Sequence, residues 1–147
     1  MRKKNLIYLA VIFLSLSPFF GNTLASVVET GNLTPVSIQN YVVVASEYND
    51  SVLTRTLSLK IQNTGNDHLY NIKATLIHIT SNGTILKGIV SFPELAPGAV
   101  LDSVDTIQYT IDTSLTTDGI IQYTWQIEYS DSTGEIFVNE AMVEENI

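Results

Sequence analysis

The most regular feature of this sequence is the alternation of apolar and polar side chains beyond about residue 35. Between Ser51 and Asn63, for example, Leu57, Leu59 and Ile61 share one parity and the residues between them are polar. Successive side chains of a β-strand point to opposite faces, so this period of two predicts strands with one buried face. About seven segments show it and none has the spacing of an amphipathic helix; the segments are 36–45, 51–63, 69–80, 84–92, 104–112, 119–129 and 135–143.

Turn-forming residues separate these segments. Asn82-Gly83 is a strong hairpin signal, and Asp131–Gly134 and Pro93–Gly98 punctuate two further connections. Short strands at this spacing predict an all-β fold, a single antiparallel sandwich of the immunoglobulin or fibronectin-III type, with a barrel as the alternative. The predicted core consists of Leu57, Leu59, Ile61, Ile72, Leu76, Ile107, Tyr109, Ile121, Tyr123, Trp125 and Ile127.

One charged residue interrupts the apolar parity. Arg55 occupies a core-facing position of its segment. A guanidinium group favours water while its stem covers apolar surface. We therefore expect this end of the strand to reach the rim of the sandwich, with the Arg55 head group in solvent.

The first 25 residues have the pattern of a secretory signal peptide. Arg2-Lys3-Lys4 is the positive region, and the apolar run Leu6–Phe20 is shorter than the ~20 residues of a spanning helix. Helix-breaking Pro18 and Gly21 follow, and we predict cleavage after Ala25, with an uncleaved anchor as the alternative. The expected organisation is a signal peptide (1–25), a short leader (26–35), the sandwich (36–143) and an acidic tail (144–147).

Charge and composition narrow the range of partners. Only four basic residues accompany all 15 acidic ones beyond residue 25, a formal charge of −11. Such a chain has no basic stripe to neutralise phosphates, so we expect no nucleic-acid partner. We also expect no stable membrane span after cleavage, because the apolar run is removed with the signal peptide. The absence of cysteine excludes disulfides and thiol chemistry. The predicted location is the periplasm or the outside of the cell.

The sequence offers little for catalysis. A nucleophile needs an oriented base, and the two histidines, His68 and His78, have no supporting motif or metal-ligand spacing. No phosphate-binding glycine loop is present, and we predict no enzyme activity, cofactor or metal site. The acidic loops 47–50 and 131–135 are interpreted as turns rather than calcium sites, and Asp102 with Asp105 as surface acids rather than a hydrolytic pair.

The aromatic row of the segment 119–129 invites a carbohydrate-platform hypothesis. Tyr123, Trp125 and Tyr129 share a parity, and the opposite parity is polar. Exposing these rings would bury the polar row without partners, at a cost of several kcal/mol. We therefore expect the three rings to face the core.

Short motifs in the chain resemble those of bacterial exported immunoglobulin-like modules. The apolar strand Leu57–Asn63 ends in Asn63-Thr64-Gly65, and Leu95-Ala96-Pro97-Gly98 follows later. Together with the segment Ile121–Tyr129 they are similar to the cell-adhesion-related domain found in bacteria. The resemblance covers about residues 36–143 and implies a non-catalytic structural or binding module.

The predicted function is contact with a protein or a cell surface. A sheet edge suits this role because its unpaired N–H and C=O groups can accept another strand. The first segment contains Tyr41, Val42, Val43 and Val44 without Lys, Arg or Pro, and we expect it to lie at an edge and mediate contact. Two alternatives remain open: a carbohydrate or small-ligand module, and a fibre subunit that assembles by strand addition.

Overall fold

The computed structural model describes residues 25–26, 35–80, 82–115 and 119–146. Ten strands and one short 3₁₀ helix form the described part of the chain. Their bounds are β1 (Ala25–Ser26), β2 (Val36–Asn49), β3 (Val52–Asn63), β4 (Tyr70–Ile79), β5 (Gly83–Lys87), β6 (Ile89–Ser91), β7 (Val100–Asp102), β8 (Ile107–Asp112), η1 (Thr113–Leu115), β9 (Ile120–Ser130) and β10 (Ile136–Asn146).

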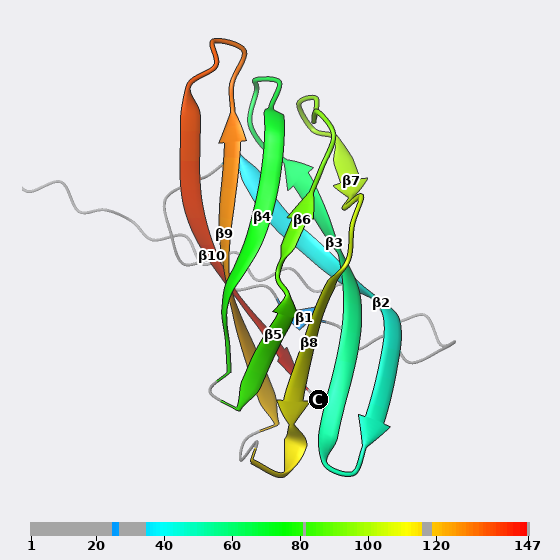
Figure 1. The fold of residues 1–147 in the computed structure, drawn as a ribbon. Coiled ribbons are helices and arrows are strands. Elements are labelled where there is room, and N and C mark those ends of the chain that lie inside the picture. Colours follow the sequence, from blue (N-terminus) through cyan, green and yellow to red (C-terminus); the bar gives the residue numbers. More distant parts are fainter. Residues whose placement is uncertain (1–24, 27–34, 81, 116–118, 147) are drawn as a thin grey trace, which may run out of the picture.

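The strands form two antiparallel sheets, as the sequence predicts. One sheet has the order β1-β10-β9-β4-β6, and the other has the order β2-β3-β8-β5, with β7 also paired to β3. The sheets face each other as the two layers of a sandwich (Figure 1). In this order β3 lies beside β8, and β4 lies beside β9. The immunoglobulin arrangement likewise pairs its second strand with its fifth and its third strand with its sixth.

One predicted strand divides between the two sheets. The segment 84–92 forms β5, which pairs with β8, and then β6, which pairs with β4. Gly88 lies between them and accepts a hydrogen bond from the Leu76 N–H at 2.7 Å. A Cβ atom at Gly88 would lie 2.8 Å from Ile85 Cγ2 and 3.1 Å from the Leu76 carbonyl oxygen. Glycine therefore allows the chain to cross from one sheet to the other at this close approach.

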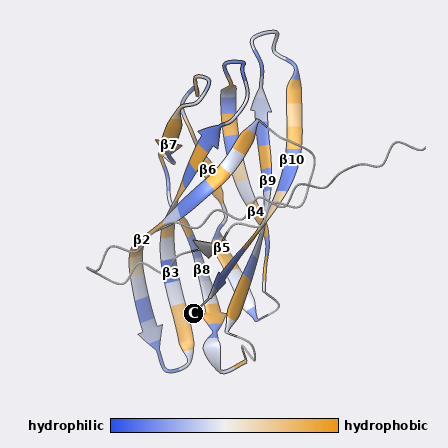
Figure 2. Ribbon diagram, turned by 180° about the vertical axis from the view of Figure 1, so that it is seen from behind, coloured by the Kyte–Doolittle hydropathy of each residue, from blue (hydrophilic) through white to orange (hydrophobic). Residues whose placement is uncertain are grey.

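The core lies between the sheets and contains every residue predicted for it. Trp125, Tyr109 and Tyr123 are the largest fully buried side chains, and none of the eleven predicted core residues is more than 3% exposed. Tyr129 is also buried. Hydrophobic and hydrophilic positions alternate along the strands (Figure 2). The period of two thus identified the buried face correctly.

Two sequence-based predictions differ from the structure. Arg55 does not reach solvent at the rim, because its side chain lies between the sheets and the residue is only 8% exposed. Residues Glu144–Asn146, predicted as an acidic tail, continue β10 in register with β9. Glu145 is 4% exposed and bonds to Arg55. The two differences have one cause, because each charge is buried against the other.

The two short motifs of the sequence meet at one end of the sandwich. Asn63 closes β3 and is fully buried. Its Nδ2 donates to the carbonyl oxygens of Asp67 and Leu95 at 2.7 and 3.0 Å, and its Oδ1 accepts from the Gly65 N–H at 2.9 Å. Its backbone carbonyl accepts from Gly98 N–H. The Asn-x-Gly and Leu-x-Pro-Gly motifs therefore act together as a hydrogen-bonded clasp.

Candidate functional site

The predicted contact strand lies at a sheet edge. Among the described strands, β2 pairs only with β3. Its pairing is interrupted twice, between Ile38 and Asn40 and between Val43 and Ala45. Bulges of this kind twist an edge and hinder the addition of a further strand. The position at an edge agrees with the prediction, whereas the contact role stays a prediction.

The four candidate contact residues divide between the core and the surface. Tyr41 is buried, and its hydroxyl oxygen accepts a hydrogen bond from Trp125 Nε1 at 2.7 Å. Val43 is partly buried and packs against the core. Val42 and Val44 are 42% and 58% exposed. Only these two valines present apolar side chains to solvent, and Tyr48 adds an exposed ring further along β2.

A buried polar network joins the two sheets in the interior. Arg55 Nη1 of β3 donates to Glu145 Oε1 of β10 at 2.6 Å, and the Tyr123 hydroxyl donates to Glu145 Oε2 at 2.6 Å. The Tyr109 and Tyr123 hydroxyls share a hydrogen bond of 2.7 Å. Arg55 Nε is buried and has no hydrogen-bond partner. Sequence analysis missed the network, although the apolar parity of Arg55 was a signal that it is buried.

Burial and neighbouring charges both shift the pKa values in this network. Burial is the largest single influence on Arg55 and lowers its pKa, but the interactions with Glu145 and Tyr109 together outweigh it and the pKa is raised. Burial raises the pKa of Tyr109 to about 12 and raises the pKa of Tyr123 further, with the charge of Glu145 adding to both. The tyrosines therefore remain neutral hydrogen-bond donors, and Arg55 and Glu145 form a charged pair.

The histidines lie at opposite ends of β4. His68 precedes the strand, where its ring stacks on Tyr70 with centroids 4.9 Å apart, and its Nε2 lies 3.8 Å from Glu94 Oε2. His78 shares the core parity in the sequence but is exposed, because the register shifts between Leu76 and His78. The structure therefore does not bring the two rings together.

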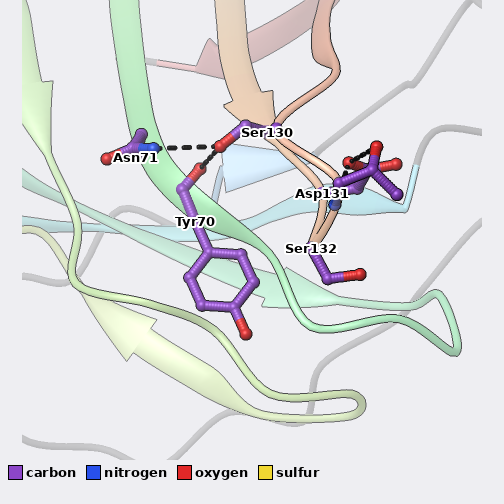
Figure 3. Close-up of a pocket in the computed structure, with 7 residues that line it drawn as sticks. Tyr70, Asn71, Ser130, Asp131 and Ser132 are labelled. Carbon is purple, nitrogen blue, oxygen red and sulfur yellow. Dashed lines mark hydrogen bonds between the residues drawn. The ribbon is translucent and has the colours of Figure 1, made fainter.

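The loop between β9 and β10 borders a shallow open hollow of about 420 Å³ (Figure 3). Its polar groups bond to one another. Asn71 Nδ2 donates to Ser130 Oγ, which donates to the Tyr70 carbonyl oxygen. Asp131 Oδ1 accepts from Thr133 Oγ1, Thr133 N–H and Glu135 N–H, and the first of these bonds is the main cause of its lowered pKa. This is the bonding of a turn-forming aspartate, as interpreted from the sequence.

The other acidic candidates, Asp102 and Asp105, each lie near a different lysine. Asp102 Oδ1 lies 3.5 Å from Lys60 Nζ, and Asp105 Oδ1 lies 3.7 Å from Lys87 Nζ. Across the described residues, no group of three or more His, Cys, Asp or Glu side chains is placed to hold a metal ion. The same residues contain no helix long and apolar enough to cross a membrane.

The predicted cleavage site lies at the margin of the described structure. Ala25 belongs to β1, where it pairs with Glu145 and Ser26 pairs with Glu144. Residues 1–24, the rest of the predicted signal peptide, lie outside the described residues. Cleavage after Ala25 stays a prediction.

Comparison with known proteins finds similarity among solved structures. No family model matches the sequence, and no curated protein is similar enough to count as a match. Among solved structures, the chain matches the crystal structure of FixG-related protein from Vibrio parahaemolyticus at 18% sequence identity. The match covers 75% of this chain and 95% of that chain, with a TM-score of 0.29.

Proposed function

We propose that this protein is an exported, non-catalytic β-sandwich module that acts by contact with another protein or a cell surface. The observation that carries the proposal is the pair of exposed valines on edge strand β2. Val42 and Val44 present apolar side chains to solvent at the edge, and Tyr41 and Val43 anchor the same strand to the core. Exposed apolar groups on a rigid edge suit recognition of a partner.

The filled interior favours this function over ligand binding between the sheets. The aromatic side chains that would line such a site are committed to the core, since Tyr41 contacts both Tyr123 and Trp125, with ring centroids 5.3 and 6.1 Å apart. The hollow beside Tyr70 lies outside the core, and its polar groups bond mainly within the loop. The exported location rests on the sequence of residues 1–25 alone.

Site-specific crosslinking tests the contact function. A photoreactive amino acid placed at Val42 or Val44 in the native host is expected to yield one dominant crosslinked product. The matched control is the same amino acid at Val104, which is 72% exposed in the connection between β7 and β8. Equal products from all three positions, or from none, would refute a contact role for β2.

A charge placed on the edge gives a second readout. Val42→Lys and Val44→Lys are expected to remove the crosslinked product and to leave the free energy of unfolding within about 0.5 kcal/mol of the parent, as for other surface substitutions. Val43→Lys is a poorer probe because its side chain packs against the core. Loss of the product together with an unchanged fold would support the proposal. A product that persists in both variants would contradict it.

A further inference from the structure

The edge of the sandwich formed by β10 is the most regular one. Its pairing with β9 runs without a register shift from Ile136 opposite Ser130 to Asn146 opposite Ile120. Every other edge of the described sheets is protected. β2 contains two bulges, β5 has a shift between Ile85 and Lys87, and β6 is only three residues long. β10 also forms the outer margin of its sheet in Figure 1.

Apolar side chains line the outer face of this edge. Ile136, Val138 and Met142 are 68%, 50% and 39% exposed. They share one parity, and the opposite parity carries Phe137, which stacks on Tyr129, and the buried Val143. β10 contains no Lys, Arg or Pro, the residues that usually discourage strand addition. Within the described part of the chain, residues 136–143 of β10 therefore combine a free backbone edge with an apolar row.

The charge of this edge limits the kind of partner. Glu140 is exposed in the middle of the apolar row, opposite Gln126, and Glu144 follows with the same parity. The nearest cation on the neighbouring strands is Lys73, which already pairs with Glu128 at 3.2 Å. A strand added here meets apolar side chains and one unpaired carboxylate, which a Lys or Arg would complement.

A second copy of this chain fits the edge poorly. In a two-fold antiparallel pair whose axis passes beside Glu140, the Glu140 carboxylates of the two copies would lie directly opposite each other. Like charges directly opposite each other destabilise a sheet. The large negative charge of the whole chain opposes the same association.

The position of β1 defines how long the added strand can be. β1 pairs with β10 only opposite Glu144 and Glu145. Among the described strands, the outer edge of residues 136–143 is unpaired. At about 3.4 Å per residue this edge accommodates an extended segment of roughly eight residues.

We propose that Ile136–Val143 binds an extended segment of another protein, added to the sheet as an antiparallel strand, with apolar side chains beside Ile136, Val138 and Met142 and a lysine or arginine beside Glu140. The backbone hydrogen bonds supply affinity, and the alternate side chains supply specificity. The surface is separate from β2, so each can fail in experiment without the other.

A matched pair of peptides tests this inference. The probe is the capped, fluorescently labelled peptide Thr-Val-Thr-Lys-Thr-Val-Thr-Val, whose lysine falls beside Glu140 in antiparallel register. The control peptide has Glu in place of Lys. Fluorescence anisotropy at low salt is expected to show about five- to tenfold tighter binding of the lysine peptide, from replacing a repulsion by an attraction. High salt should reduce this difference.

Charge reversal on the protein completes the test. Glu140→Lys is expected to invert the preference between the two peptides, and Val138→Lys to weaken the lysine peptide at least tenfold. Val42→Lys on β2 is the matched control and should change neither affinity. Hydrogen exchange is expected to show protection of residues 136–143 by the lysine peptide.

Four results would overturn the proposal. They are equal affinity for the two peptides, no binding of either, an unchanged preference in Glu140→Lys, and protection at β2 in place of β10. Sedimentation of the protein alone gives a further check. A dimer with protected β10 amides would assign the edge to a second copy and refute the proposed partner chemistry.

Discussion

Strand β3 buries two polar side chains on the same face, and they are stabilised in different ways. Asn63, at the end of the strand, is neutral, and its side chain makes three hydrogen bonds to backbone groups of nearby loops. Arg55, near the start, is charged, and its counter-charge is Glu145, which lies 90 residues away in the sequence. Arg55 Nε has no hydrogen-bond partner. The first arrangement uses neutral backbone groups of two loops, one of them directly after β3, and the second depends on a charge at the far end of the chain.

The difference determines what happens when one partner is lost. When a neutral side chain such as that of Asn63 is removed, its backbone partners lose hydrogen bonds, but partners near the surface can bond to water instead. An isolated buried charge cannot be compensated in this way, because transfer of an ion from water costs several kcal/mol even after relaxation. We therefore expect the two ends of β3 to differ in sensitivity to substitution.

The largest effect is expected from Glu145→Gln. This variant preserves the shape of the side chain and leaves Arg55 buried without a counter-charge. The expected loss in the free energy of unfolding is about 3–5 kcal/mol, measured by urea denaturation. Glu144→Gln is the matched control, because Glu144 is more exposed and its side chain accepts a hydrogen bond from the neutral Gln122 Nε2.

Replacement of both charged partners separates the charge from the packing. The double variant Arg55→Met with Glu145→Leu is expected to recover most of the stability lost in Glu145→Gln, because no isolated charge remains. A double variant as unstable as the single one would show that the network matters through its geometry, including the bond from Tyr123.

A smaller effect is expected at Asn63. Asn63→Ala leaves the Gly65 N–H and the carbonyl oxygens of Asp67 and Leu95 without their side-chain partner. The expected loss is about 2–3 kcal/mol by the same urea measurement. Hydrogen exchange should show faster opening of the clasp. A loss as large as that of Glu145→Gln would contradict the expected difference between the two ends of β3.

Alkaline pH is expected to lower the free energy of unfolding through the buried network around Arg55. The pKa of Tyr109 is raised by burial from 10.0 to about 12 in the folded chain. Below about pH 10 its contribution to stability is complete. Above it the unfolded chain releases a proton that the folded chain retains, so stability falls as pH rises toward 12. The expected slope is up to about 1.4 kcal/mol per pH unit for each such tyrosine, from urea midpoints, and Tyr109→Phe should reduce it.

The smallest effect is expected outside β3, at the solvated turn of Asp131. Asp131→Ala removes three hydrogen bonds to the loop between β9 and β10. Because the turn is exposed, we expect faster amide exchange at residues 133–135 and little change in the global unfolding midpoint. An unfolding midpoint that falls as far as that of Asn63→Ala would show that this turn also holds the core together.

The comparison also explains how much the sequence could predict. The buried rows, such as Leu57–Ile61 and Tyr123–Ile127, were correct because a period of two depends only on local geometry. The ion pair was not predicted, because the position of Glu145 opposite Arg55 depends on how the two sheets pack. Glu144–Asn146 look like a solvated tail by composition, and only the neighbouring strand shows that they are paired.

At the candidate surfaces too, local patterns were predictable from the sequence and the details of strand pairing were not. The edge position of β2 agreed with the prediction, since the first strand of such a sandwich has one neighbour in the observed order. The bulge between Ile38 and Asn40, after which Tyr41 faces the core, and the register shift that exposes His78 depend on pairing and have no marker in the sequence. The apolar row of β10 was readable from its residues, but its uninterrupted register was not.

The ion pair between Arg55 and Glu145 also has a consequence for the order of events during synthesis. During synthesis β3 is complete long before residue 145 is added, so the Arg55 side chain stays solvated until β10 is available. The interior cannot close around an uncompensated cation, so tight packing is postponed until the chain is nearly finished. Under the export proposed above, this delay would keep the chain unfolded during its passage through a narrow channel, and the final strand would complete the fold on the far side.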